Sequence, residues 1–193
     1  MKWRFFVLTF FLLNIGGLNA LNTQLSVIPR GHILSARFIQ KRHIKDLNNP
    51  IQSKGMMYLW VGRGLIWETQ DPLKQSVLIN QNGFYLLNNH EKTTLLETGG
   101  ENIIFDLINI NDPQKVQGFK IEELAHPPKG FHFRFIPQSK RALEAIQSIE
   151  IQGKIYIERM VIHRPSGNWD EMLFEGHEIS KEAPPYLKVL FND

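Results

Sequence analysis

The sequence of 193 residues predicts a mainly β protein with an antiparallel sheet and a few short helices. Two observations predict this class. Short runs of β-branched and aromatic residues alternate with Gly, Asp-Pro and Asn-Gly signals, which are typical of strands joined by tight turns. In residues 131–135, three phenylalanines alternate with His132 and Arg134, so an extended chain places three rings on one face and two polar side chains on the other.

Residues 1–20 have the order of a secretory signal peptide. Lys2 and Arg4 precede an apolar run, and the small residue Ala20 stands at the expected cleavage point. A transmembrane anchor is the competing interpretation, but the apolar run is shorter than the roughly 20 residues that a bilayer span needs. We therefore expect cleavage near Ala20, export from the cytoplasm, and a single domain over residues 21–193.

The charge balance and the lack of cysteine narrow the function classes. Removing the signal peptide lowers Lys plus Arg from 22 to 20, against 19 acidic residues. A nearly neutral chain gives no electrostatic case for nucleic-acid binding, which needs a clustered basic face. Without cysteine there is neither a disulfide framework nor a site for an amino-terminal lipid anchor, so we expect a soluble monomer held together by an ordinary core.

Most of the expected strands lie in short runs between turn signals. A helix-like turn leads into the first strand, and Asn82-Gly83 is the strongest hairpin signal, because this pair readily adopts the positive φ of a tight turn. After the phenylalanine run, two or three further strands are joined at Gln152-Gly153 and at residues 165–168. The strands expected before residue 90 are residues 36–41, 56–61, 64–69, 76–81 and 83–88.

Two further segments carry apolar residues outside these expected strands. In residues 101–110, apolar side chains recur at spacings of three and four, which favours a short amphipathic helix over a strand. The apolar group at residues 187–191 follows Pro184-Pro185, and we expect it to pack along an edge of the sheet.

The sequence carries no motif that indicates catalysis. It has no H-E-x-x-H, no G-x-S-x-G and no phosphate-binding glycine loop, and its histidines lack the spacing of metal ligands. The adjacent carboxylates of Asp170 and Glu171 point to opposite faces if the chain is extended, and nothing selects an acid and base pair. We expect a protein that is not an enzyme and that uses no metal or cofactor.

Several expected strands are apolar on both faces. In residues 56–61, Met57 and its alternate neighbours form one face, whereas Tyr58 and Trp60 form the other. In a sheet with one solvent-exposed face, apolar and polar residues alternate more strictly along each strand. We therefore expect both faces of this sheet to be covered. Two architectures explain this pattern: a sandwich or closed barrel with a filled interior, or a curved sheet whose concave side holds an apolar ligand.

The stretch YLWVGRGLIWETQDP, residues 58–72, resembles the amino-terminal signature of the LolA family of periplasmic outer-membrane lipoprotein carriers. The preceding ARFIQKRHI and the following SVLINQNGFYLLN are similar to that family's F-x-Q strand and its next hairpin. IIFDLIN falls where the family has a lid helix, and FHFRFIP falls at its F-x-x-x-P strand. The chain departs from the family where Gly62 and Gly64 flank Arg63, in place of a longer connection with proline.

The resemblance implies an unclosed antiparallel β-barrel, or half-barrel, with an α-helical lid over an apolar concave face. Such carriers work in the periplasm without nucleotide. They accept acylated lipoproteins from an inner-membrane ABC release complex and pass them to an outer-membrane receptor lipoprotein. Two alternatives stay open, a carrier of the same fold for another lipid, such as a glycolipid or a polyketide-type lipid, and a non-enzymatic adaptor with a filled core.

The resemblance also implies roles for individual residues. Arg63 matches the arginine that fastens the closed lid, and the alternative is a solvated turn arginine stacked on Trp60 or Trp67. The lid candidates are Ile103, Ile104, Phe105, Leu107 and Ile108. The candidates for the wall of the lipid groove are Trp60, Trp67, Phe84, Phe131, Phe133 and Phe135.

Overall fold

The computed structural model describes residues 28–88, 91–94, 118–125 and 130–191. These residues form eleven strands and two short helices. The helices are α3 (Lys140–Ala145) and α4 (Pro185–Leu190). The strands are β1 (Ile33–His43), β2 (Ile51–Trp60), β3 (Gly64–Asp71), β4 (Gln75–Asn80), β5 (Gly83–Asn88), β6 (Glu91–Thr94), β7 (Phe119–Ala125), β8 (Phe131–Pro137), β9 (Ser148–Gly153), β10 (Ile157–His163) and β11 (Trp169–Ser180).

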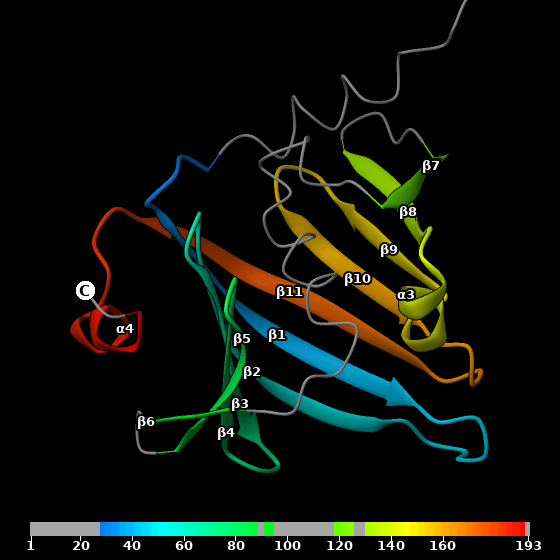
Figure 1. Ribbon diagram of the computed structural model, residues 1–193, viewed down its shortest axis with the longest axis horizontal. Helices are drawn as coiled ribbons and strands as arrows, with labels where there is room; N and C mark the ends of the chain where they lie inside the picture. Colours follow the sequence, from blue (N-terminus) through cyan, green and yellow to red (C-terminus); the bar gives the residue numbers. More distant parts are fainter. Residues whose placement is uncertain (1–27, 89–90, 95–117, 126–129, 192–193) are drawn as a thin grey trace, which may run out of the picture.

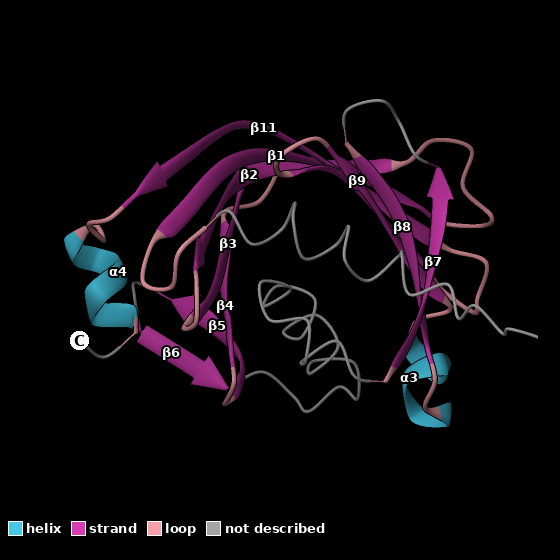
Figure 2. Ribbon diagram, turned by 90° about the horizontal axis from the view of Figure 1, so that it is seen from above, coloured by secondary structure: helices cyan, strands magenta, loops and turns pink. Residues whose placement is uncertain are grey.

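All eleven strands belong to one antiparallel sheet with the order β6-β5-β4-β3-β2-β1-β11-β10-β9-β8-β7. The first and last strands of the chain's sheet, β1 and β11, pair in its middle, and Figure 1 shows them side by side. Seen from above, the sheet bends into an arch whose two edges, β6 and β7, do not meet (Figure 2). The predicted mainly β, unclosed half-barrel with short helices is confirmed.

The arch has two apolar faces. Side chains alternate between the faces along each strand, and residues paired directly across neighbouring strands share a face. On β2, Met57 packs with the cluster of one face, whereas Tyr58 and Trp60 pack with the cluster of the other, which includes Leu187 and Leu190 of α4. Figure 2 places α4 outside the arch, so the Trp60 face is the outer face and the Met57 face is the inner face.

Gly55 lies on β2 at a register shift in the pairing of β2 with β3. A Cβ at this position would overlap the carbonyl oxygen of Glu68 on β3 and touch the ring of Phe38 on β1. Because β2 has no side chain here, the Phe38 ring passes over it and stacks on Trp67 of β3, with ring centroids 4.0 Å apart. A glycine within a strand therefore brings the side chains of β1 and β3 together on the inner face.

The predicted hairpins are found with small shifts. The Asn82-Gly83 signal marks the turn from β4 to β5, although the two-residue loop is Gln81-Asn82 and Gly83 is the first residue of β5. Asn80 supports the loop, because its side-chain oxygen accepts a hydrogen bond of 2.8 Å from the backbone N–H of Asn82. The first strand is longer than residues 36–41, and three strands, β9 to β11, follow residue 146.

The two helices differ from the sequence-based expectations. The prediction that residues 187–191 pack along a sheet edge is wrong, because they belong largely to α4, which begins after Pro184 and packs on the outer face. Helix α3 was not predicted. Ser139 precedes this helix and caps it, because its hydroxyl accepts a hydrogen bond from the backbone N–H of Ala142. Within the described residues, no helix is long and apolar enough to cross a membrane.

Candidate functional site

The inner face carries the largest apolar cluster that the structure describes. One row of paired residues crosses four neighbouring strands of this face, from Ile121 through Phe135 and Ile149 to Ile162. All but Ile121 in this row are buried. The inner cluster consists of Ala36, Phe38, Phe131, Phe133, Phe135, Ala142, Ile146, Ile149, Ile151, Ile162, Met172 and Phe174, with Met57, Trp67, Phe119, Ile121, Ala145, Ile157 and Met160 packed against it.

Aromatic rings join the two halves of the inner cluster. Trp67 stacks on Phe38 and meets Phe174 of β11 edge-on, with ring centroids 6.0 Å apart. In the other half of the cluster, the rings of Phe131 and Phe133 on β8 stack with their centroids 6.2 Å apart. Large aromatic side chains bury much apolar area, so their contacts make this face a continuous apolar surface.

Of the predicted groove residues, the structure brings four together on the inner face: Trp67, Phe131, Phe133 and Phe135. Phe84 is on the same face by register, at the end of a row of directly paired residues. That row is Leu34, Leu59, Leu65, Ile79 and Phe84.

Trp60 is not with them. It lies on the outer face, where its indole N–H donates to the Gly31 carbonyl oxygen at 3.1 Å and its ring meets Phe191 edge-on. The five lid candidates, residues 103–105, 107 and 108, lie outside the described residues, so their role stays a prediction.

Arg63 lies in the turn between β2 and β3, and its side chain is directed to Trp60. The guanidinium carbon is 4.4 Å from the centroid of the Trp60 ring, which is the geometry of a cation–π contact. The backbone N–H of Arg63 also donates to the Trp60 carbonyl oxygen at 2.8 Å. The stacking that we considered as the alternative to a lid latch is therefore present, and the latch itself stays a prediction.

A buried carboxylate interrupts the apolar inner face at one end. Asp170 continues the row of Ile149 and Ile162 by direct pairing, and only 2% of its side chain is exposed. Its Oδ1 accepts hydrogen bonds from Arg42 Nε at 2.7 Å and from Gln40 Nε2 at 3.2 Å. Its Oδ2 accepts from Arg164, with Nη2 at 2.8 Å and Nε at 3.2 Å.

Two arginines keep this carboxylate charged. Burial acts to raise the pKa of Asp170, but the hydrogen bonds and charges of Arg42 and Arg164 outweigh it and hold the pKa below its usual value. From the sequence, Asp170 was considered only as one of two adjacent carboxylates and was given no role in a site. The available signal was that it alternates with Met172 and Phe174, so a charged residue occupies an inward position. The prediction that Asp170 and Glu171 point to opposite faces is confirmed, because Glu171 pairs with Arg159 on the outer face.

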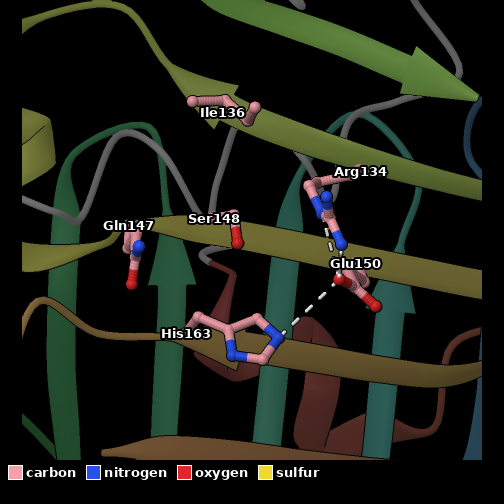
Figure 3. Close-up of a pocket in the computed structure, with 6 residues that line it drawn as sticks. All are labelled: Arg134, Ile136, Gln147, Ser148, Glu150 and His163. Atoms are coloured by element: carbon pink, nitrogen blue, oxygen red, sulfur yellow. Dashed lines mark hydrogen bonds and ion pairs between the residues drawn. The ribbon is translucent and has the colours of Figure 1, made fainter. Parts of the chain in front are cut away.

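The outer face has a hollow of about 380 Å³ over β8, β9 and β10 (Figure 3). Its polar groups are largely paired with one another, since Arg134 Nη2 lies 2.7 Å and His163 Nε2 lies 3.8 Å from Glu150 Oε1. Burial raises the pKa of Glu150, but Arg134 and the neighbouring histidines outweigh it and lower the pKa. The hollow is lined by Arg134, Ile136, Gln147, Ser148, Glu150 and His163.

The candidate site is therefore the inner face rather than the outer hollow. The inner face offers an apolar surface that crosses most of the sheet, whereas the hollow is small, open and satisfied by ion pairs. Among the residues that the structure describes, no group of three or more His, Cys, Asp or Glu side chains is placed to hold a metal ion. The arrangement suits the binding of an apolar molecule.

Comparison with known proteins gives one family match. A family model described as outer membrane lipoprotein carrier protein LolA matches residues 32–185, which include every strand of the sheet. A search of curated proteins finds no match to the sequence.

Solved structures resemble the chain at low identity. A LolA superfamily protein from Nitrosomonas europaea is 6% identical with a TM-score of 0.49, over 89% of this chain and 96% of that chain. A structure of the MucA and MucB complex from Pseudomonas aeruginosa has 9% sequence identity and a TM-score of 0.48, over 88% of this chain and 62% of that chain. A DUF1329 family protein from Desulfovibrio piger has 8% sequence identity and a TM-score of 0.45, over 90% of this chain and 92% of that chain.

Proposed function

The chain belongs to the LolA family of outer membrane lipoprotein carrier proteins, and from this premise we propose that it carries lipids by holding acyl chains against the inner face of the half-barrel. In the full form of the proposal, it is a periplasmic shuttle for acylated lipoproteins. It receives them from an inner-membrane ABC release complex and delivers them to an outer-membrane receptor lipoprotein. It performs no chemical step and needs no cofactor.

The inner cluster is the observation that carries the proposal. Burial of one acyl CH₂ contributes about 0.8 kcal/mol, so a chain of about 16 carbons represents on the order of 10 kcal/mol before ordering costs. The side chains of the inner cluster are already buried in the structure. A ligand therefore exchanges one apolar contact for another, and the net affinity is smaller than the gross gain. A carrier needs this balance, because it must release its cargo.

The tryptophans provide a test, because Trp67 is on the inner face and Trp60 on the outer face. Two variants each keep one of them, with the other and both Trp3 and Trp169 replaced by phenylalanine. A brominated fatty acid quenches tryptophan only at close contact. We expect it to quench the fluorescence of the chain that keeps Trp67 and to leave that of the chain that keeps Trp60 unchanged.

The non-brominated fatty acid is the matched control, since it binds equally and does not quench. Equal quenching of both tryptophans would place the ligand elsewhere, and no binding of either fatty acid would refute an acyl carrier.

The latch role of Arg63 remains part of the proposal, and it makes a separate prediction. Arg63→Leu removes an exposed cation–π contact worth about 0.5–1 kcal/mol, so the variant should stay folded. We expect it to release a bound fluorescent fatty acid to acceptor vesicles more slowly or incompletely. Arg30→Leu, a turn residue at the same end of the sheet, is the control. Transfer by Arg63→Leu at the rate of the unaltered chain would remove the latch assignment.

A further inference from the structure

The two arginines on Asp170 carry one positive charge more than the carboxylate requires. A buried carboxylate is compensated by a single hydrogen-bonded cation. Here Arg42 and Arg164 each bond to a different oxygen of Asp170, and Gln40 adds a third donor. The group therefore has a net positive charge, and the part of the chain that the structure describes places no second carboxylate within hydrogen-bond reach of the two guanidinium groups.

Toward the residues that the structure describes, both arginines keep N–H groups without a partner, and these groups can bind a ligand. The side chain of Arg42 is 51% exposed and that of Arg164 is 38% exposed, whereas Asp170 beneath them is buried. A guanidinium has five N–H groups, and Arg42 uses only its Nε on Asp170. Arg164 uses Nε and Nη2. Their remaining N–H groups are held in place by a common buried anchor, which lowers the ordering cost of binding an anion.

The group lies where the apolar inner face ends. Along β1, Arg42, Gln40 and Phe38 share the inner face, so the surface changes from charged to aromatic over four residues, about 13 Å. Ile51 pairs directly with Arg42 and is about half exposed, so an apolar side chain lies beside the cation at the rim. A surface that joins exposed cations to an apolar wall fits a molecule with a negative head and an apolar tail.

We propose that Arg42 and Arg164, positioned by Asp170, form a headgroup subsite for an anionic lipid, with its phosphate or carboxylate on the two guanidinium groups and its acyl chains on the inner cluster. This inference rests on the acyl-binding part of the proposed function, and it assigns a free anionic lipid, rather than an acylated lipoprotein, as the cargo. A planar guanidinium matches the oxygens of phosphate or carboxylate with paired hydrogen bonds. The amide-linked and ester-linked acyl groups of a lipoprotein carry no such charge, so the subsite favours a free anionic lipid.

The test compares alkyl ligands that differ only in the head. Displacement of an apolar dye from the purified chain is measured with dodecyl phosphate, with dodecyl maltoside below its micelle concentration, and with inorganic phosphate alone. We expect dodecyl phosphate to bind at least tenfold more tightly than the neutral maltoside, with the preference falling as salt rises. Arg42→Gln and Arg164→Gln should each reduce the phosphate preference about tenfold and leave maltoside binding unchanged.

Arg159→Gln is the matched control. Arg159 is 35% exposed and its Nε donates to Glu171 at 2.7 Å, so it resembles Arg164 in exposure and Arg42 in pairing, but it lies on the outer face. We expect its phosphate preference to equal that of the unaltered chain. Circular dichroism of each variant verifies that the sheet is intact, and the second arginine still compensates Asp170 in each single variant.

The outcomes separate the two proposals. If both alkyl ligands bind equally, or if Arg159→Gln weakens phosphate binding as much as Arg42→Gln, the headgroup subsite is refuted while the acyl carrier stands. If neither alkyl ligand displaces the dye, the acyl carrier fails as well. Inorganic phosphate that binds as tightly as dodecyl phosphate would show a plain anion site, and would also refute the lipid subsite.

Discussion

Gly55→Ala is expected to lower the free energy of unfolding by about 3 kcal/mol or more, because a methyl group at this position has no room. Its Cβ would overlap the backbone carbonyl oxygen of Glu68, and it would push on the ring of Phe38. A backbone atom moves only if strand β3 moves. The substitution therefore opposes the pairing of β2 with β3 and the stacking of Phe38 on Trp67.

Denaturant unfolding measures the loss, and near-ultraviolet circular dichroism reports on the packing of Trp67. Gly83→Ala is the control. Gly83 has a φ of 129° and a Cβ there would meet no atom within 4 Å, so alanine causes only backbone strain, roughly 1–2 kcal/mol. We expect the tryptophan signal to change only in Gly55→Ala. A smaller loss of stability at Gly55 than at Gly83 would contradict the tight packing of Glu68 and Phe38 against Gly55.

Local sequence signals predicted the strands well because each depends on few residues. The alternation in residues 131–135 and the Asn82-Gly83 turn act within a single strand or hairpin. Whether the sheet closes is a different question, since it depends on the pairing of β1 with β11 across more than a hundred residues. The half-barrel was predicted only through family resemblance. Helix α3 was missed because its six residues are too few to show a helical period.

The face of each groove residue follows from hairpin register, which composition does not reveal. The turn at residues 61–63 pairs Trp60 with Gly64 and Met57 with Trp67. Met57 and Trp60 are on opposite faces of β2, so Trp67 and Trp60 are too. The same rule, applied to the predicted strands, could have separated the two tryptophans. The meeting of Arg42, Asp170 and Arg164 could not be found this way, because it needs the long-range register of β1, β10 and β11.

Asp170→Asn is expected to lower the free energy of unfolding by about 3 kcal/mol at pH 7, because it removes the one anion that two arginines share. Asparagine keeps the shape of the side chain and one acceptor oxygen, but the two guanidinium groups then repel each other near a buried position. Denaturant unfolding at pH 7 measures the difference. Glu171→Gln is the matched control, as its carboxylate is the next residue, lies on the outer face and pairs with a single arginine. We expect it to cost less than about 1 kcal/mol.

The pH dependence tests whether the lost energy comes from the charge of Asp170. Its pKa is lowered in the folded chain, so the carboxylate contributes stability above its unfolded pKa of about 3.9, and that contribution is lost as the pH falls through the folded value. The difference in the free energy of unfolding between the unaltered chain and Asp170→Asn should therefore be largest at neutral pH and should shrink below about pH 4. If this difference in the free energy of unfolding stays constant down to about pH 2, asparagine destabilises the fold through its shape or its hydrogen bonding and not through the loss of charge. In that case the arginines would not be held by the charge of Asp170, and their preorganisation for an anionic headgroup would lose its physical basis.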